Sequence, residues 1–359
     1  MNIDTTDNIR NANERGLKEE CRRSIRRLSM GSSFIPEGRT ILDDDQNRVA
    51  QNDIEEGLEL GQGNFSKVRE VKSFRRNSMG ASICSSTVSE SFQPCVDPES
   101  RSYYYAVKKV RKDLSEARIH NATVDLVVEA QFLTSLSHQH IVSLEGVGDD
   151  PGSKDFFIIL EKLDRTLANE IFAWKKEASV LKKIHCRDER KLSIKRRRDK
   201  HIEYARDLSS ALAYLHDKNM IFRDLKPENV GFTHDNMIKL FDLGLARELK
   251  EERKVGRDKY LLSLCGTRRY MAPEVMKGSP YGLPADVFSF SLLLWEMVHT
   301  EKPFRNLDAK QHERALVLWR SRPKVSGDVP RAVKSIIVKS WNNDAKNRPR
   351  MIDVFDSIH

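Results

Sequence analysis

Long apolar runs are missing from this 359-residue sequence, and no stretch approaches the ~20 residues that a membrane-spanning helix needs. The polar residues 1–53 also lack the apolar segment of a secretory signal peptide. Cysteine is scarce: the five cysteines are scattered and form neither a metal-binding pair nor an evident disulfide framework. These absences argue against membrane, secreted and cysteine-metal classes, and they favour a cytoplasmic protein in a reducing compartment.

Positive charge is unevenly distributed along the chain. The formal net charge is +9, and residues 179–200 alone hold ten lysines and arginines against three acids. Because the remainder is close to balance, the composition argues against a broad nucleic-acid-binding surface. For the basic insert three interpretations stay open: a solvated loop, a docking or nuclear-import segment, and a site for nucleic acid or an anionic membrane. No aromatic residue is interleaved with its charges, which weakens the third.

The order of patterns predicts an α+β protein with two lobes, a small antiparallel β-sheet lobe with one main helix and then a larger helical lobe. Residues 1–53 have no sustained apolar period and are predicted to be a disordered extension of a folded domain at 54–359. The predicted boundaries are 54–163 for the first lobe, 164–359 for the second, 72–102 for a Ser-rich flexible insert in the first, and 179–200 for the basic insert in the second.

Local periodicity predicts the individual elements. Residues 57–74 alternate apolar and polar around a glycine-rich turn, as in a β-hairpin. Residues 122–137 place apolar side chains at helical intervals, and residues 285–298 are apolar nearly all round, as in a buried helix. The other predicted elements are strands at 103–110 and 156–163 and helices at 201–218, 331–341 and 351–359.

Weak signals of a phosphate site lie in the first lobe. Gly61 and Gly63 lie at the hairpin turn, where backbone amides can approach a polyanion. Lys108 lies on a predicted strand, and Glu129 on the next helix is its candidate acid partner. Each signal has an ordinary alternative: a plain turn, and a lysine whose ammonium group reaches water.

The second lobe supplies the stronger pattern. Two acids, two bases and an asparagine crowd into "IFRDLKPENVGF" (221–232), which is followed by "IKLFDLGLAR" (238–247) and "CGTRRYMAPE" (265–274). With the Gly-rich loop, the strand lysine and the helix glutamate, these segments resemble the catalytic core of eukaryotic protein kinases. The resemblance is to the serine/threonine-directed kinases and, within them, the tyrosine-kinase-like group. It covers 54–359 apart from the inserts, and it implies ATP and Mg²⁺ as ligands.

The resemblance implies a role for each charged residue of the second lobe. Asp224 would accept or orient the proton of the substrate hydroxyl, and Lys226 would meet the γ-phosphate of ATP. Asn229 and Asp242 would supply hard oxygen ligands, which suit Mg²⁺. If these roles are absent, the same fold would serve as a pseudokinase scaffold that binds partners without efficient catalysis.

The resemblance also implies where the nucleotide binds. Lys108 would hold the α- and β-phosphates, with Glu129 fixing its position. Val68 and Ala106 would cover the adenine, and the hinge backbone would hydrogen-bond its edge. The implied nucleotide-binding residues are Gly61, Gln62, Gly63, Asn64, Phe65, Ser66, Val68, Ala106, Lys108, Glu161 and Leu163.

Some residues resemble structural or regulatory parts of the family. Glu274 and Arg348 resemble an ion pair that ties the A-P-E segment to the rear lobe. Asp286 resembles a buried acid that holds the catalytic-loop backbone. Thr267 would hydrogen-bond Asp224 and Lys226, which favours protein substrates with serine or threonine hydroxyls.

Arg223, beside the catalytic aspartate, suggests control by phosphorylation of the activation segment, residues 242–274, by an upstream kinase. The candidate sites are Tyr260, Ser263 and Thr267, and Ser263 is favoured.

The sequence departs from the family pattern at four positions. Phe222 replaces a common histidine and Leu243 a common phenylalanine, and both can still pack in an apolar core. Ser66 stands at the third glycine of the phosphate loop. Gly231 stands where a large aliphatic side chain commonly lies under the adenine, so a roomier nucleotide floor is expected.

Overall fold

The computed structural model describes residues 4–29, 32, 35, 48–74, 93–94, 104–181 and 187–358. The chain divides into two compact units. The first consists of Met1–Ser137 and Val142–Lys162, and the second of His138–Ile141 and Leu163–His359. The observed division at 162/163 lies one residue from the predicted lobe boundary.

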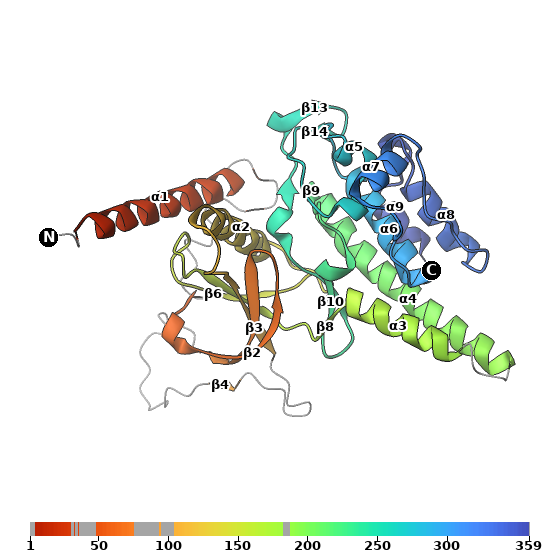
Figure 1. The fold of residues 1–359 in the computed structure, drawn as a ribbon, viewed down its shortest axis with the longest axis horizontal. Coiled ribbons are helices and arrows are strands. Elements are labelled where there is room, and N and C mark those ends of the chain that lie inside the picture. The colour runs from red at the N-terminus through yellow and green to blue at the C-terminus, as the bar shows by residue number, and fades with distance from the viewer. Residues whose placement is uncertain are drawn as a thin grey trace. The chain divides into compact units, whose positions relative to one another are not determined.

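The first unit is built on one sheet with the strand order β1-β6-β7-β5-β3-β2, and β4 pairs with β3 (Figure 1). Its strand pairs are antiparallel apart from the parallel pair β1–β6. The predicted hairpin is present as β2 and β3. The strands are β1 (Arg48–Val49), β2 (Ile54–Gln62), β3 (Ser66–Phe74), β4 (Gln93–Pro94), β5 (Tyr105–Val110), β6 (Leu144–Gly148) and β7 (Phe157–Glu161).

One core of β-branched and aromatic side chains supports this sheet. Such side chains pack well on a pleated surface, and strands β3, β5 and β7 each contribute to the core. Its buried members are Val49, Val71, Phe74, Val107, Phe157 and Ile159. The predicted main helix is present as α2 (Glu116–Ser135), which contacts β5, β6 and β7.

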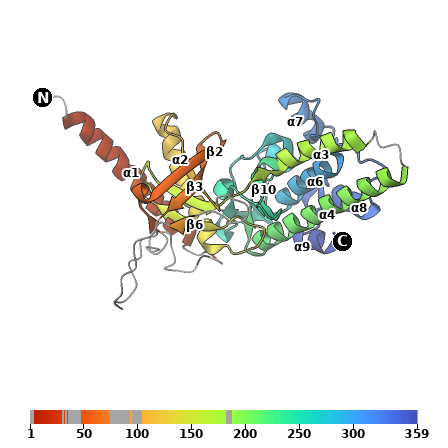
Figure 2. The same cartoon turned by 90° about the horizontal axis from the view of Figure 1, so that it is seen from below.

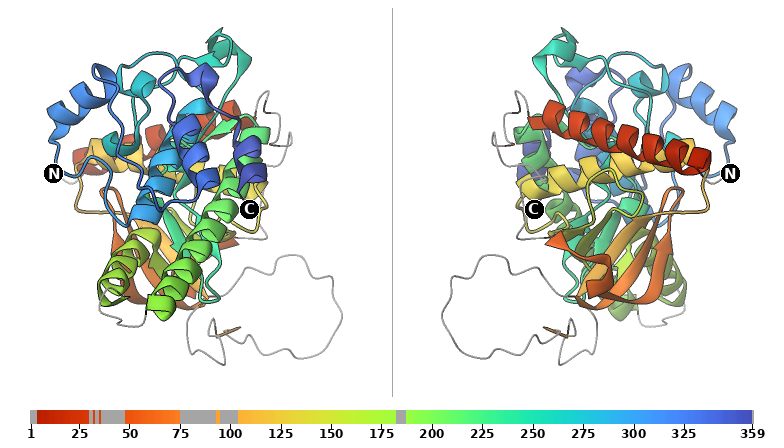
Figure 3. Two further views of the ribbon diagram at one scale, coloured as in Figure 1. Left: turned by 90° about the vertical axis from the view of Figure 1, so that its right-hand side faces the viewer. Right: turned by 90° about the vertical axis from the view of Figure 1, so that its left-hand side faces the viewer.

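The expectation of disorder over residues 1–53 is wrong for residues 4–29, which form helix α1 (Asp4–Ser29), and for residues 48–53, which hold β1 and a short 3-10 helix (Gln51–Asp53). Leu17, Cys21 and Ile25 recur at four-residue intervals and are all buried. This stripe has a single apolar residue per turn, which is too sparse to stand out among the surrounding charges. α1 contacts α2, and Figure 3 shows the two helices side by side.

The predicted Ser-rich insert, 72–102, lies largely outside the described residues. Its first residues belong to a strand, because β3 continues to Phe74. Gln93 and Pro94 pair with Phe74 and Ser73 at the end of the same strand.

The second unit is mostly helical, as predicted (Figure 2). Its helices are α3 (Leu167–Leu181), α4 (Arg187–Asp217), α5 (Pro273–Met276), α6 (Pro284–His299), α7 (Ala309–Val317), α8 (Arg331–Ser340) and α9 (Met351–Ser357). Its short strands are β8 (Arg165–Thr166), β9 (Met220–Ile221), β10 (Val230–Phe232), β11 (Ile238–Leu240), β12 (Arg247–Glu248), β13 (Lys254–Gly256) and β14 (Lys259–Tyr260). The predicted α+β class with a sheet unit and a helical unit is therefore confirmed. Within the described part of the chain, no helix is both long and apolar enough to cross a membrane.

The solvated-loop interpretation of the basic insert, 179–200, is wrong for residues 179–181, which end α3, and from residue 187 onward, where α4 begins; residues 182–186 lie outside the described residues. Lysine, arginine and glutamate are good helix formers, and this stretch contains neither glycine nor proline. Arg197 donates to the Trp174 carbonyl at 3.0 Å, and His201 stacks on the Trp174 ring with centroids 3.7 Å apart. These contacts join α4 to α3, so part of the basic charge is structural.

Candidate active site

Asp224 is the centre of a hydrogen-bonded cluster in the second unit. Lys226 Nζ lies 2.7 Å from Asp224 Oδ2 and 3.1 Å from Thr267 Oγ1. Asn229 Nδ2 donates to Asp224 Oδ2 at 3.0 Å and to its carbonyl at 2.9 Å. The amide and hydroxyl of Thr267 both donate to Asp224 Oδ1 at 2.7 Å. The predicted contacts of Thr267 are present, and the carboxylate is held in one orientation from several sides.

The backbone before Asp224 is fixed by a buried acid on α6. Asp286 accepts the amides of Phe222 at 2.7 Å and Arg223 at 2.9 Å, and His216 Nε2 lies 3.1 Å from it. Arg223 has a φ of 74°, a left-handed conformation that most side chains avoid. The two hydrogen bonds that these amides donate to Asp286 compensate this strain, and they help to direct the next residue, Asp224, toward Thr267.

Asn229 and Asp242, the predicted metal ligands, lie on adjacent backbone. The amide of Phe241 donates to the carbonyl of Asn229 at 3.0 Å, so Asp242 follows directly beside it. Asp242 is left-handed, with a φ of 66°. Because the amide nitrogen of Asn229 is committed to Asp224, its side-chain oxygen is the end that remains for a cation.

Lys108 and Glu129 form a buried ion pair in the first unit. Lys108 Nζ lies 2.7 Å and 3.0 Å from the two carboxylate oxygens of Glu129, and the glutamate is 2% exposed. β5 supplies the lysine and α2 the glutamate. Val68 lies opposite Lys108 in the β3–β5 register, and Ala106 is buried two residues before it.

The Gly-rich loop joins β2 and β3 and is held from the end of β5. Gly63 donates its amide to the Ser66 carbonyl at 2.8 Å. Arg111 donates its amide to the Phe65 carbonyl at 2.9 Å and its guanidinium to the Gly63 carbonyl at 3.1 Å. The exposed residues of the loop are Gly61, Gln62, Gly63, Asn64 and Phe65.

The hinge amides differ in their partners. Glu161 donates its amide to the Ser143 carbonyl at 3.2 Å, and Lys162 donates to the Tyr104 carbonyl at 2.7 Å. Both amides are therefore used inside the first unit. Of the two predicted hinge residues, Glu161 and Leu163, the amide of Leu163 is therefore the better candidate donor to the edge of an adenine.

The roomier floor expected at Gly231 is not present. A Cβ placed on Gly231 would lie 2.7 Å from Leu163 Cδ1 and 3.2 Å from the Arg165 carbonyl oxygen. Leu163 therefore fills the space that a larger side chain at this position would take. A side chain at position 231 would displace the end of Leu163 and crowd the Arg165 carbonyl. Phe222 and Leu243 are both buried, as expected.

The predicted structural ion pair is present. Arg348 Nη1 and Nη2 lie 2.6 Å and 2.8 Å from the two carboxylate oxygens of Glu274. The arginine side chain is fully buried, and it also donates to the carbonyls of Pro284 and Asn342.

Sequence reasoning missed a buried acid, Glu296, on α6. Tyr270 donates its hydroxyl to Glu296 Oε2 at 2.6 Å. Burial raises the pKa of Glu296 to about 7, the nearby Glu228 carboxylate adds to the rise, and the Tyr270 hydrogen bond opposes it. A charged residue within the apolar run 285–298 was the available signal.

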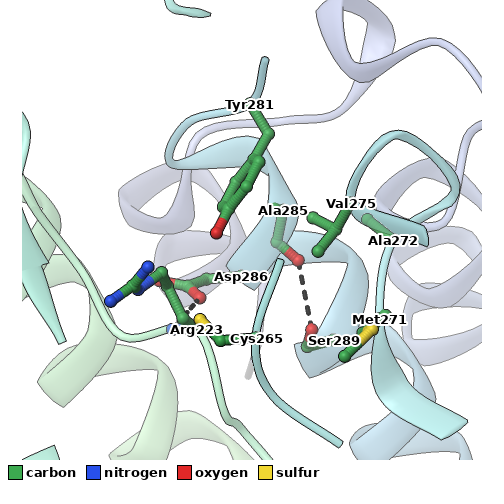
Figure 4. Close-up of a pocket in the computed structure, with 9 residues that line it drawn as sticks. All are labelled: Arg223, Cys265, Met271, Ala272, Val275, Tyr281, Ala285, Asp286 and Ser289. Atoms are coloured by element: carbon green, nitrogen blue, oxygen red, sulfur yellow. Dashed lines mark hydrogen bonds between the residues drawn. The ribbon is translucent and has the colours of Figure 1, made fainter. Parts of the chain in front are cut away.

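The activation segment packs beside Arg223. A cavity of about 10 Å³, room for roughly one water molecule, lies between Arg223, Tyr281 and α6 (Figure 4). Arg223 donates from Nε to the Leu245 carbonyl at 2.6 Å and from Nη1 to the Ser263 hydroxyl at 3.2 Å. Tyr281 donates its hydroxyl to the Ser263 carbonyl at 2.7 Å.

Phosphoryl transfer depends on the placement of charge. It uses a fixed aspartate with a lysine beside it, here Asp224 and Lys226. It also uses a carboxamide next to a carboxylate, here Asn229 and Asp242. Such an arrangement is typical of a protein kinase domain. Residues 93–357 match the protein kinase domain family, and the chain belongs to the protein kinase family.

Several curated proteins are similar to the chain. A dual specificity protein kinase, shkB, of Dictyostelium discoideum is 27% identical over 251 residues, which are 69% of this chain and 35% of that protein. The serine/threonine-protein kinase STY17 of Arabidopsis thaliana is 32% identical over 158 residues, 44% of this chain and 27% of that protein. The chain thus spans about a third or less of the length of these relatives.

Replacing Glu274 by alanine is expected to lower the free energy of unfolding by about 3–5 kcal/mol, because it leaves the buried Arg348 charge unpaired. Thermal and urea unfolding measure the loss. The matched control is Glu301→Ala, which removes an exposed i,i+4 pair with Arg305 and should cost ~0–1 kcal/mol. Equal melting of Glu274→Ala and wild type would contradict the structural role.

Replacing Glu296 by glutamine is expected to remove a pH dependence of stability. Between pH 4.5 and about 7 the folded state keeps a proton that the unfolded state has released, so the unfolding free energy of the wild type falls as pH rises through this window. The total fall corresponds to about 3 kcal/mol. Urea unfolding at pH 5 and pH 8 should show this component in the wild type and in the exposed control Glu313→Gln, but not in Glu296→Gln. The same slope in all three proteins would rule it out.

Proposed function

We propose that this protein is an ATP- and Mg²⁺-dependent kinase that phosphorylates serine and threonine hydroxyls of proteins. The observation that carries the proposal is the cluster in which Asp224 is hydrogen-bonded by Lys226, Asn229 and Thr267. The similar proteins described above support it, since both are named as protein kinases. A pseudokinase scaffold needs none of these contacts.

The geometry suits Asp224 to receive the proton of an attacking hydroxyl. Its carboxylate is buried at 8% exposure, and its orientation is set by neighbours rather than by solvent. Lys226, 2.7 Å away, supplies the positive charge that the transferred phosphoryl group requires. A preorganised donor set of this kind lowers the barrier because little rearrangement accompanies the reaction.

The residues at the proposed metal site fit a hard divalent cation. Asn229 and Asp242 offer neutral and anionic oxygens from adjacent backbone, and the second unit holds both. Oxygen ligands of this kind suit Mg²⁺ more than zinc or copper. When bound, the cation would neutralise phosphate charge, while Asn229 also keeps Asp224 in place through its amide nitrogen.

The position of Thr267 favours substrates whose hydroxyl lies on a short side chain. Its side chain lies against both Asp224 and Lys226, which narrows the approach to the carboxylate. Serine and threonine have short side chains, so their hydroxyls can reach the Asp224 carboxylate through this narrow approach. In the first unit, Lys108 paired with Glu129 is proposed to hold the α- and β-phosphates, and the loop amides of residues 61–66 to cover them.

Phosphoryl transfer from γ-labelled ATP to a serine/threonine peptide array tests the proposal. Asp224→Ala is expected to lower kcat at least ~10²-fold, because it removes proton acceptance and positioning together. Asp242→Asn should abolish Mg²⁺-dependent transfer. The matched control is Asp356→Ala, an exposed aspartate on α9 in the same unit, and its kcat should equal that of the wild type. A wild-type protein that binds nucleotide but transfers no label would support the pseudokinase scaffold instead.

We also propose activation by phosphorylation of Ser263 by an upstream kinase. The structure supports this residue among the three candidates because it is exposed and its hydroxyl contacts Arg223. Tyr260 is buried, and the hydroxyl of Thr267 is already held by Asp224. A phosphate at Ser263 would form a charge-assisted hydrogen bond to the Arg223 guanidinium.

Removing this phosphate is expected to lower kcat roughly tenfold or more, since one charge-assisted hydrogen bond contributes about 1.5–3 kcal/mol. Phosphatase treatment and Ser263→Ala should give the same loss. In Arg223→Ala the treatment should have no further effect, because the partner of the phosphate is gone. Full activity of the dephosphorylated wild type would overturn this mode of control.

The exposed cations of α4, Lys191, Lys195 and Arg196, keep the proposal of a docking or nuclear-import segment open for the basic region. They are presented on a helix rather than on an extended loop. No contact within the described residues depends on these three side chains, so their substitution would leave the catalytic cluster intact.

A further inference from the structure

Helix α1 lies on α2 by one continuous apolar stripe. Leu17 is 2% exposed, and Cys21 and Ile25 are completely buried, whereas Arg22 and Arg23 between them are exposed. Burial raises the pKa of the Cys21 thiol to about 12, as expected for a thiol in apolar surroundings. α1 contacts α2, and the two helices lie side by side in the views of Figure 3, so we take α2 as a surface that covers this stripe.

The middle of α2 is buried on all sides, whereas packing on the sheet alone would bury only one side of the helix. Residues 126–133 are all buried, although these eight consecutive residues point in every direction around the helix axis. Strands β5, β6 and β7 contact α2 on its sheet side, and among the described elements of the first unit α1 makes the other extensive contact with it.

Polar contacts fix the position of α1 along α2. Glu20 of α1 contacts His120 of α2 through its carboxylate. Lys18 Nζ lies 3.3 Å from Asp150, which Arg48 also contacts at 3.3 Å.

A glycine fixes the same position from the backbone side. Gly152 has a φ of +93°, and a Cβ on it would lie 2.6 Å from Lys18 Cα. The loop after β6 therefore accepts the backbone of α1 at one place, and α1 has a defined seat rather than a general apolar contact.

The residue that makes this seat relevant to the site is Glu129. It lies on the enclosed part of α2, and its carboxylate holds Lys108 at 2.7 Å. Any shift or rotation of α2 moves this carboxylate, because the side chain is buried and has one orientation.

We infer that α1 is a positioning element for phosphoryl transfer: by packing Leu17, Cys21 and Ile25 on α2, it keeps Glu129 in contact with Lys108. The inference rests on the proposed kinase function, and it predicts that loosening α1 impairs nucleotide use without touching the residues that bind it. It concerns the first unit alone, since every contact that carries it lies there.

The test is Ile25→Gln in the full chain, because glutamine keeps helix propensity while its amide is poorly accommodated in an apolar seat. We expect KM for ATP to rise and kcat to fall, each at least about fivefold, because a shift of one kcal/mol changes a conformational population by about that factor. KM for the peptide should stay unchanged. Amide hydrogen exchange in residues 122–133 should become faster.

The matched control is Arg22→Gln, which introduces the same side chain on the exposed side of α1 and should behave as wild type. The conservative Ile25→Val should restore both kinetic constants. If Ile25→Gln fails to fold, Ile25→Ala takes its place. A raised KM for ATP with an unchanged KM for the peptide would again support the inference.

Faster exchange in α1 with unchanged kcat and unchanged KM for ATP would overturn the inference. A wild type without any transferase activity would count against the proposed function alone, because faster exchange of α2 in Ile25→Gln would still show that α1 holds α2.

Discussion

The carboxylate of Asp286 accepts two main-chain amides, and the arrangement of the second unit's site depends on these hydrogen bonds. They hold Phe222 and Arg223 in a conformation that includes a positive φ, so the strain of the loop is compensated by α6. The next residue is Asp224, whose direction is thereby set by a buried helix. A site built on a rigid element keeps its geometry better than one built on a free loop.

Buried charges of the second unit have specific partners. Asp224 is held by Lys226, Asn229 and Thr267, and the buried Arg348 is held by Glu274. In a medium of low dielectric constant, satisfied networks are rigid and unsatisfied ones are costly. The same reasoning applies to Lys108 and Glu129 in the first unit. The requirement for complete pairing explains why such varied residue types are crowded into 221–232.

The residues of the candidate site could be predicted from sequence because the chemistry fixes both their type and their spacing. Their neighbours could not. Glu296 lies inside an apolar run, and only the fold shows that Tyr270 reaches it. The filling of the space at Gly231 by Leu163 depends on two segments that are about seventy residues apart. Charge dominates the composition of α1 and of the start of α4. It predicts disorder for the first and leaves a solvated loop among the three interpretations of the second, because helix propensity is silent about partners.

α1 shows how such a segment becomes ordered. With one buried apolar residue per turn, it has little to gain from any surface except one that it matches along several turns. An isolated helix of this kind is marginal in water, because nucleation is unfavourable and propensity adds little for each residue. Formation of the α1 helix and its docking on α2 are therefore expected to be coupled, so that neither contributes to stability without the other. The helical order of α1 therefore depends on the surface of α2 as well as on the segment's own sequence.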